Sequence, residues 1–186
     1  MTNILLAGYI AIEATHKLIE KERPALSCRF SNRFLSLTDE MTSREMVSHD
    51  SIEKVIKGCG YAKNSDLDII EISETGIFGT LWELAEANNC GLNIDLTKIS
   101  IKQETVEIFE WMDVNPYTYP SKGAWLISSE DAYDLKDDLE KAGIKASVIG
   151  YETSSKDRVI INQDETRFLT PIDRLLKDEQ GQKNYR

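Results

Sequence analysis

The sequence predicts an α/β (α+β) fold in which a mixed β-sheet is flanked by helices. Short apolar, strand-like runs alternate along the chain with longer segments whose apolar residues recur at helical spacing. Strands and helices interleaved in this way pack as helical layers against a sheet. No stretch rich in proline, glycine or serine divides the 186 residues, so we expect one domain over residues 1–177.

The composition argues against two classes of partner. The formal net charge is −10, and no basic stripe is present to displace counterions from a phosphate backbone, so we expect no nucleic-acid partner. The apolar start, MTNILLAGYIAI, is too short to span a bilayer and lacks an export signal, so no membrane partner is expected. Three cysteines without CxxC spacing indicate free thiols in a reducing compartment, and we predict a cytoplasmic location.

The chain begins with a predicted strand and two predicted helices. Asn3–Ala7 is an apolar run, and Ile10–Glu22 has the pattern of an amphipathic helix that ends at Pro24. Ala25–Leu37 is expected to be a second helix. The apolar residues that recur there at helical offsets are Leu26, Phe30, Phe34 and Leu37.

A polar tract from Thr38 to Asn64 has no clear pattern except for a short helix expected at Asp50–Gly58. Beyond it, Leu67–Ile72 is a predicted strand and Ile77–Asn88 a predicted helix. Leu92–Leu96 alternates in the manner of a strand.

The second half repeats this alternation of helices and strands. Glu104–Met112 is a predicted helix, and Gly123–Ser128 is a predicted strand. Ser128-Ser129-Glu130-Asp131 has the pattern of a capping box that opens a helix to Ala142, with Gly143 at its C′ position.

The chain is expected to close with three strands and a frayed end. The strands are expected at Ala146–Glu152, Arg158–Asn162 and Thr166–Leu169, joined by polar turns. Residues 178–186 carry no apolar anchor and are expected to form a disordered tail.

Several motifs, in the same order along the chain, resemble a known family. The run IFGTLWELAEANNCGLNIDLTKISIKQETVEIFEWMDVNPY (Ile77–Tyr117) is similar to the aminoimidazole ribonucleotide (AIR) synthase-related proteins, and most similar to the C-terminal half of hydrogenase expression/formation protein E. NILLAGYIAIEAT, SKGAWLIS and VIGYETSSKDRVIINQDETRFL extend the resemblance over nearly the whole chain. It implies a PurM-like C-terminal domain. Complete family members also carry an N-terminal domain that dimerises and supplies most of the ATP site, and we expect that domain to be absent here.

The resemblance also implies a metal ligand after the second predicted strand. In the family this turn reads approximately Asp-Val-Thr-Glu-Gly-Gly, and its acid helps to hold Mg²⁺ against ATP phosphates. Here the tract is Glu71–Gly76 (EISETG), so Glu71 takes the place of the metal-binding aspartate. Thr75 replaces the first glycine, and its side chain restricts close approach of the backbone to a phosphate.

The rest of this turn is a candidate phosphate site. The residues that the resemblance places against phosphate are Ser73, Glu74, Thr75 and Gly76. The alternative is that the turn is inherited architecture, in which Ser73 or Thr75 caps the following helix.

A second candidate loop corresponds to a Ser-Ser-Gly-Ser segment that lies beside the phosphates in the family. Its counterpart here is Ser121-Lys122-Gly123-Ala124. Lys122 would supply a cation to an anionic ligand, whereas Ala124 has lost a hydroxyl group. The alternative interpretation is that Lys122 is a solvated loop lysine.

These observations support three hypotheses of function. The first is a free-standing binding or assembly module, self-associating as a dimer and without complete catalytic machinery. The second is a subunit of a split ATP-dependent phosphoryl-transfer enzyme that a separate N-terminal-domain protein completes, with Mg-ATP as cofactor. The third is a regulatory domain that senses a small anionic metabolite at the same turn.

Overall fold

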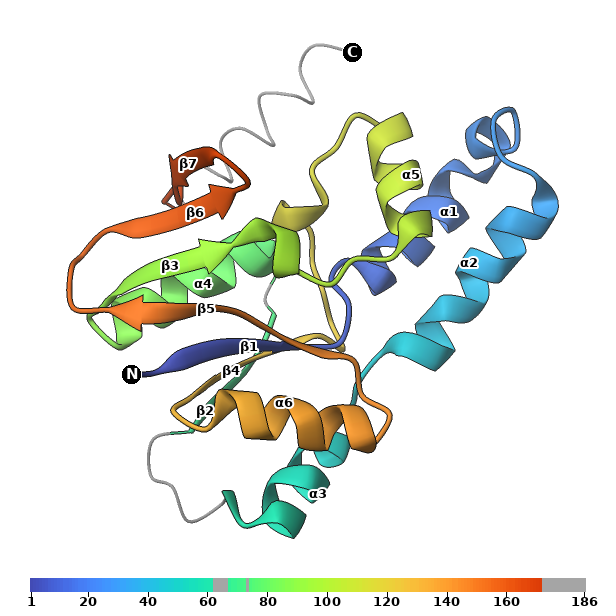
Figure 1. Ribbon diagram of the computed structural model, residues 1–186. Helices are drawn as coiled ribbons and strands as arrows, with labels where there is room; N and C mark the ends of the chain where they lie inside the picture. Colours follow the sequence, from blue (N-terminus) through green and yellow to red (C-terminus); the bar gives the residue numbers. More distant parts are fainter. Residues whose placement is uncertain (62–66, 73, 172–186) are drawn as a thin grey trace.

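One mixed sheet forms the centre of the computed structural model, which describes residues 1–61, 67–72 and 74–171. Its described strands are β1 (Asn3–Ala7), β2 (Asp68–Glu71), β3 (Gly91–Asp95), β4 (Trp125–Ser129), β5 (Ala146–Thr153), β6 (Arg158–Asn162) and β7 (Glu165–Phe168). Their order across the sheet is β2-β4-β1-β5-β3-β6-β7, and only β3 and β6 pair in parallel (Figure 1). The predicted α/β fold with a mixed sheet is confirmed.

Helices cover the sheet and extend beyond one end of it. The helices of the described chain are α1 (Ile12–Leu26), α2 (Asn32–Glu45), α3 (His49–Cys59), α4 (Gly76–Ala87), α5 (Gln103–Trp111) and α6 (Ala132–Lys141), with short 3₁₀ turns η2 (Leu96–Lys98) and η3 (Pro116–Thr118). Among the residues described, no helix has the length and apolar character needed to cross a lipid bilayer.

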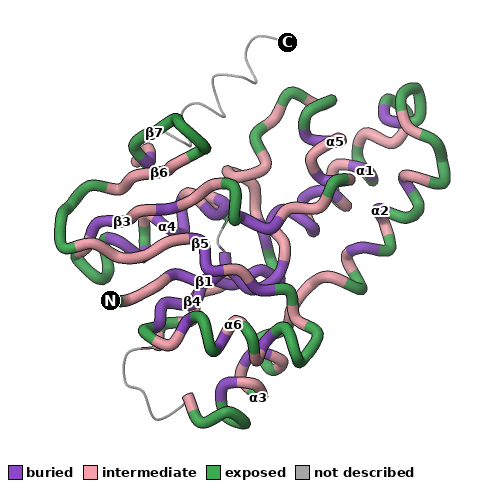
Figure 2. Tube along the Cα trace, viewed as in Figure 1, coloured by how far each residue is buried: buried purple, intermediate pink, exposed green. Residues whose placement is uncertain are grey.

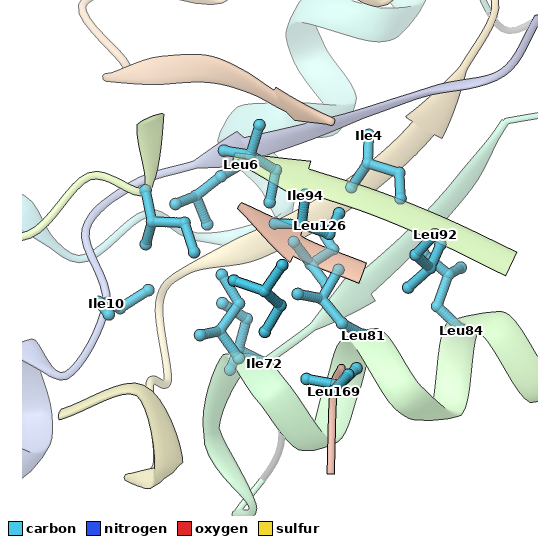
Figure 3. Packing of buried hydrophobic residues seen from close by; sticks show 14 of the residues in the cluster. Ile4, Leu6, Ile10, Ile72, Leu81, Leu84, Leu92, Ile94, Leu126 and Leu169 are labelled. Carbon is cyan, nitrogen blue, oxygen red and sulfur yellow. The ribbon is translucent and has the colours of Figure 1, made fainter. Parts of the chain in front are cut away.

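The two faces of the sheet build two hydrophobic cores, because successive side chains of a strand point to opposite faces. Ile4 and Leu6 of β1 lie on the face covered by α4, together with Leu81 of that helix (Figure 3). Leu5 and Ala7 lie on the other face, where α3 and α6 pack. The buried segments follow this arrangement through the centre of the sheet (Figure 2).

The helices α1, α2 and α5 form a third layer beyond the end of β1 (Figure 1). Ile19, Leu35 and Ile108 are buried between them. Thr15 of α1 and Thr105 of α5 are also buried there, with their hydroxyl oxygens 3.0 Å apart.

The expected helix Ala25–Leu37 is wrong in its first part. Helix α1 is kinked at Glu22, whose backbone angles are non-helical (φ −111°, ψ 17°), and a second short helical segment continues through Pro24 to Leu26. The predicted end of the first helix near Glu22 therefore corresponds to this kink. Helix α2 then begins at Asn32, where the Ser31 hydroxyl accepts the Phe34 N–H. The helical spacing was misleading because residues from two different helices and the turn between them meet in the same core.

The tract from Thr38 to Asn64 contains the end of α2 and all of α3, as far as residue 61. The predicted helix Asp50–Gly58 is confirmed within α3. Ser48 caps its N-terminus by accepting the Ser51 N–H, and Gly60 ends it in the left-handed conformation.

The predicted capping box before α6 is wrong. Ser128 and Ser129 are the last two residues of β4, and the Ser128 hydroxyl donates to Glu152 at 2.7 Å. The Ser129 hydroxyl accepts the Asp131 N–H, and the helix begins one residue later. Gly143 follows α6 with φ +81°, as the sequence predicts for its C′ residue. The predicted tail, 178–186, lies outside the described residues.

Candidate functional site

The two candidate turns lie side by side, although 52 residues separate Glu71 from Gly123 in the chain. Strands β2 and β4 pair antiparallel with Glu71 opposite Trp125, so the end of β2 meets the loop that precedes β4. Glu71 Oε1 accepts the Gly123 N–H at 3.0 Å, and the Ile72 N–H donates to Ala124 O at 3.0 Å. The carboxylate proposed to hold magnesium therefore already anchors the second loop through one of its oxygens.

Gly76 begins α4 in a conformation that a side chain would disrupt. Its φ is +70°, and a Cβ atom there would lie 2.5 Å from the Tyr117 carbonyl oxygen. The turn thus packs directly on η3, and the need for glycine has a structural explanation that does not involve phosphate.

The other residues of this turn differ in their exposure. Glu74 is exposed, and Ser73 lies outside the described residues. Thr75 occupies the N-cap position of α4 without the side-chain cap hydrogen bond that the alternative interpretation expected. Its side chain instead leaves no room for a Cβ atom at Gly79, one turn further along the helix.

Ser121 is buried and serves the start of α1. Its hydroxyl accepts the Ala11 N–H at 2.8 Å and donates to Tyr119 O at 3.0 Å. Ala11 has a left-handed backbone (φ 58°) immediately before α1, so this hydrogen bond fixes the entry of the chain into the helix. Lys122 is exposed and forms no ion pair with any residue that the structure describes.

The linker between α2 and α3 covers the second loop. A Cβ atom at Gly123, where φ is +79°, would lie 2.7 Å from Met46 Cβ. The Val47 N–H donates to Gly123 O at 2.8 Å, and the Trp125 indole N–H donates to Val47 O at 2.8 Å. This cover comes from the tract that the sequence analysis could not assign, and no periodic pattern in the sequence indicates it.

A small cavity of about 150 Å³ adjoins the linker and is lined by Gly8, Tyr9, Arg44, Glu45, Met46 and Lys145, among others. Beside it, Lys102 donates to Glu45 at 2.8 Å and lies over the Tyr9 ring. Burial is the largest single effect and lowers the pKa of Lys102, but the hydrogen bond to Glu45 and the electrostatic interactions with Glu45 and Tyr9 together outweigh it, so the pKa of Lys102 is raised. The sequence analysis missed this ion pair because its partners are 57 residues apart.

A magnesium ion at Glu71 would need several oxygen ligands besides this carboxylate. No group of three or more histidine, cysteine, aspartate or glutamate side chains is placed to hold a metal in the ranges 1–61, 67–72 and 74–171. Magnesium requires six oxygen ligands in a near-regular octahedron. Backbone or hydroxyl oxygens, water, a nucleotide or a second protein would supply those that Glu71 does not.

Comparison with known proteins gives one family and one curated relative. Residues 69–162, just over half of the chain, match the model of the AIR synthase related protein, C-terminal domain. A stretch of 108 residues is 31% identical to the uncharacterized protein MJ0640 of Methanocaldococcus jannaschii, covering 53% of this chain and 32% of that protein.

Solved structures share the fold at low sequence identity. E. coli HypE, a hydrogenase maturation protein, matches with a TM-score of 0.69 and 14% identity over 94% of this chain and 51% of that one. HypE in complex with ATP matches with a TM-score of 0.62 and 16% identity over 91% of this chain and 50% of that one. Thiamine monophosphate kinase from Aquifex aeolicus matches with a TM-score of 0.57 and 11% identity, over 89% and 51%. The chain therefore spans about half the length of these structures.

Proposed function

Because this chain belongs to the family of AIR synthase related proteins through their C-terminal domain, we propose that it is a binding and assembly module that contributes one side of a ligand site. A second domain or protein completes that site. The observation that carries this proposal is the contact between the two family turns, Glu71 with Gly123 at 3.0 Å.

The module is incomplete because most polar groups of these turns serve the chain's own structure. Ser121 holds the start of α1, Gly76 packs on η3, and one oxygen of Glu71 holds the second loop. Glu74 and Lys122 remain exposed and available to a ligand or partner. A catalytic site needs several groups held in fixed positions around the reacting atoms, and these two side chains do not provide that.

The partner in this proposal is either a second copy of the chain or a separate protein that carries the N-terminal domain of the family. HypE has been crystallised in complex with HypF, which supports partner binding as a role for this type of domain. In the cell we place the assembly in the cytoplasm, on the basis of its unpaired cysteines.

Calorimetry with Mg-ATP tests the proposal on the purified chain. We expect no hydrolysis by the chain alone, because the residues that the structure describes on its side of the site do not form a group that would activate and orient the nucleophile. Weak binding is expected, reduced by Glu71→Gln and by Lys122→Ala. The matched controls are Glu104→Gln, a partly buried glutamate at the start of α5, and Lys54→Ala, an exposed lysine on α3. Hydrolysis by the chain alone, lost in Glu71→Gln, would contradict the proposal.

A split phosphoryl-transfer enzyme is the second candidate. The fold is shared with HypE in complex with ATP and with a thiamine monophosphate kinase complexed with AMPPCP and TMP, at TM-scores of 0.62 and 0.55. In this case, addition of the N-terminal-domain protein produces ATP turnover that depends on Glu71. Stable complex formation without any turnover favours the assembly module instead.

The third candidate, a sensor of a small anionic metabolite, uses the same exposed groups. Lys122 is the cation nearest in sequence to the Glu71–Gly123 contact. A metabolite lacking a triphosphate that binds the chain alone, and is lost in Lys122→Ala, would favour this candidate.

A further inference from the structure

We propose that a second site, distinct from the Glu71–Gly123 turns, binds a flat aromatic ring that carries a carboxylate. The site is a cavity of about 350 Å³ between the first turn of α4, η3 and the hairpin of β6 and β7. Among its lining residues are Phe78, Leu96, Tyr117, Ile160, Arg167 and Phe168. This volume is at the lower end of the range found for small-molecule sites, roughly 300–1,000 Å³.

The walls of the cavity favour an aromatic ligand. The rings of Phe78 and Tyr117 are stacked, with centroids 5.2 Å apart and planes within 8° of parallel. Ile160 and Leu96 belong to or pack against the buried core on the α4 side of the sheet, so they add an apolar surface. A flat ring can extend such a stack and gain more than the burial of its area alone, which an aliphatic group of equal size cannot do.

Phe168 is a further aromatic residue among those that line the cavity. It is the last residue of β7, and its side chain is 71% exposed. An exposed aromatic ring that lines a cavity can be buried against a bound aromatic ligand.

The charge of the cavity favours an anion. Among the described residues that line the cavity, only Arg167 carries a charge, and that charge is positive. The protein as a whole has a formal net charge of −10. One guanidinium nitrogen donates to Glu165 at 2.6 Å, and the side chain is 75% exposed, so further donors remain for a ligand. A single arginine that is already partly neutralised by Glu165 suits a singly charged carboxylate better than a doubly charged phosphate.

The phenol of Tyr117 is compatible with a carboxylate ligand in this cavity. Burial raises the pKa of its phenol above its ordinary value, at which the hydroxyl group is already neutral at physiological pH. A phenolate at this position would repel a carboxylate.

The cavity adjoins the family turn without sharing its residues. The carbonyl oxygen of Tyr117, which lines the cavity, packs on Gly76 of the family turn. Phe78, another lining residue, lies two positions after Gly76 in the chain. Glu71, Ser121 and Lys122 do not line the cavity. The inference therefore goes beyond the proposed function and does not depend on nucleotide binding.

Titration of the ¹⁵N-labelled full chain with 2-naphthoate tests the proposal by NMR. We expect saturable shifts of the amide signals of Phe78, Tyr117 and Arg167. The uncharged isostere 2-naphthamide is expected to bind about tenfold more weakly, and cyclohexanecarboxylate, which has the charge without the aromatic ring, at least as weakly.

Two pairs of variants assign the contacts. Arg167→Gln is expected to weaken 2-naphthoate about tenfold and to leave 2-naphthamide unchanged, whereas Arg29→Gln, at an exposed arginine near α2, changes neither. Phe168→Ser is expected to weaken both ligands, whereas Tyr133→Ser, at a similarly exposed aromatic residue on α6, has no effect. All four side chains are largely exposed, so these variants are expected to fold.

Three outcomes would overturn the proposal. They are the absence of saturable binding, shifts that map to another part of the molecule, and equal affinity of Arg167→Gln and Arg29→Gln for 2-naphthoate. Glu71→Gln separates this result from the proposed function, because it is expected to weaken Mg-ATP binding and to leave 2-naphthoate binding unchanged.

Discussion

Gly76 shows how one residue of the family turn can be required for structure. Both its positive φ and its contact with the Tyr117 carbonyl oxygen exclude a side chain. Gly143 shares the positive φ (+81°), but a Cβ atom there would meet nothing within 4 Å. The pair therefore separates the cost of backbone strain from the cost of crowding.

Gly76→Ala is predicted to lower the free energy of unfolding much more than Gly143→Ala does. The strain alone costs about 1–2 kcal/mol at either position, and crowding against backbone adds about 1–3 kcal/mol at Gly76. Urea denaturation measures both. Gly58→Ala within α3, where the added Cβ is unhindered, serves as a control and is expected to stabilise by about 0.5–1 kcal/mol. Equal losses at Gly76 and Gly143 would show that the turn does not pack tightly on η3.

At the scale of elements, a tyrosine joins α3 to α6. Tyr61 follows α3, and its hydroxyl donates to Asp138 of α6 at 3.0 Å. Burial and this hydrogen bond to a carboxylate raise the pKa of Tyr61 well above its ordinary value. The native state thus retains a proton that the unfolded chain releases near pH 10.

The stability of the protein is predicted to fall as the pH rises above about 10. Below that pH both states keep the phenolic proton, so the stabilisation is fully present; above it only the unfolded state loses the proton, which favours unfolding. Tyr61→Phe removes this titration and is expected to flatten the slope in urea unfolding between about pH 10 and 11.5. Part of the pH dependence of stability is expected to remain in Tyr61→Phe, because burial also raises the pKa of the Tyr117 phenol. An unaltered slope in Tyr61→Phe would contradict this account.

At the scale of the whole molecule, the two cores on either face of the sheet share the same strands. Leu5 and Leu6 are neighbours in β1 but belong to different cores. Loss of one core therefore removes the support of the strands that build the other. This arrangement supports the proposal of one domain over residues 1–177, of which the structure describes residues 1–61, 67–72 and 74–171.

A single unfolding transition is predicted for both cores. Trp82 packs against the core under α4, and Trp125 belongs to the core under α6. A third tryptophan, Trp111 at the end of α5, belongs to neither core and is replaced by phenylalanine in both variants. Trp82→Phe and Trp125→Phe in this background each leave one tryptophan, so the fluorescence of each variant reports on the core that the remaining tryptophan contacts. We expect the fluorescence and far-ultraviolet circular dichroism midpoints to coincide within each variant. A fluorescence transition that precedes loss of secondary structure in either variant would indicate that the cores unfold separately.

Local signals in the sequence explain why most elements were predicted. These signals depend on neighbours within a few residues. They are the alternation of apolar residues in β3, the glycine that follows α6, and the apolar residues at helical spacing in α4. The predictions of the capping box before α6 and of the start of the second helix were wrong because each local pattern fits two different structures. Ser128 and Ser129 fit a helix cap, but pairing of β4 with β1 and β2 extends the strand through both of them. Leu26 and Phe34 share a core from different helices.

The amino-acid sequence by itself determined the class of fold, the alternating strands and the family, because apolar periodicity and motif order are properties of the chain alone. Only the tertiary structure decided what the candidate residues touch. Glu71 meets Gly123, Ser121 serves the start of α1, and the ring of Phe78 stacks on Tyr117. These contacts join segments 39 to 110 residues apart, and which distant segments meet depends on how strands pair in the sheet, which spacing along the chain does not encode.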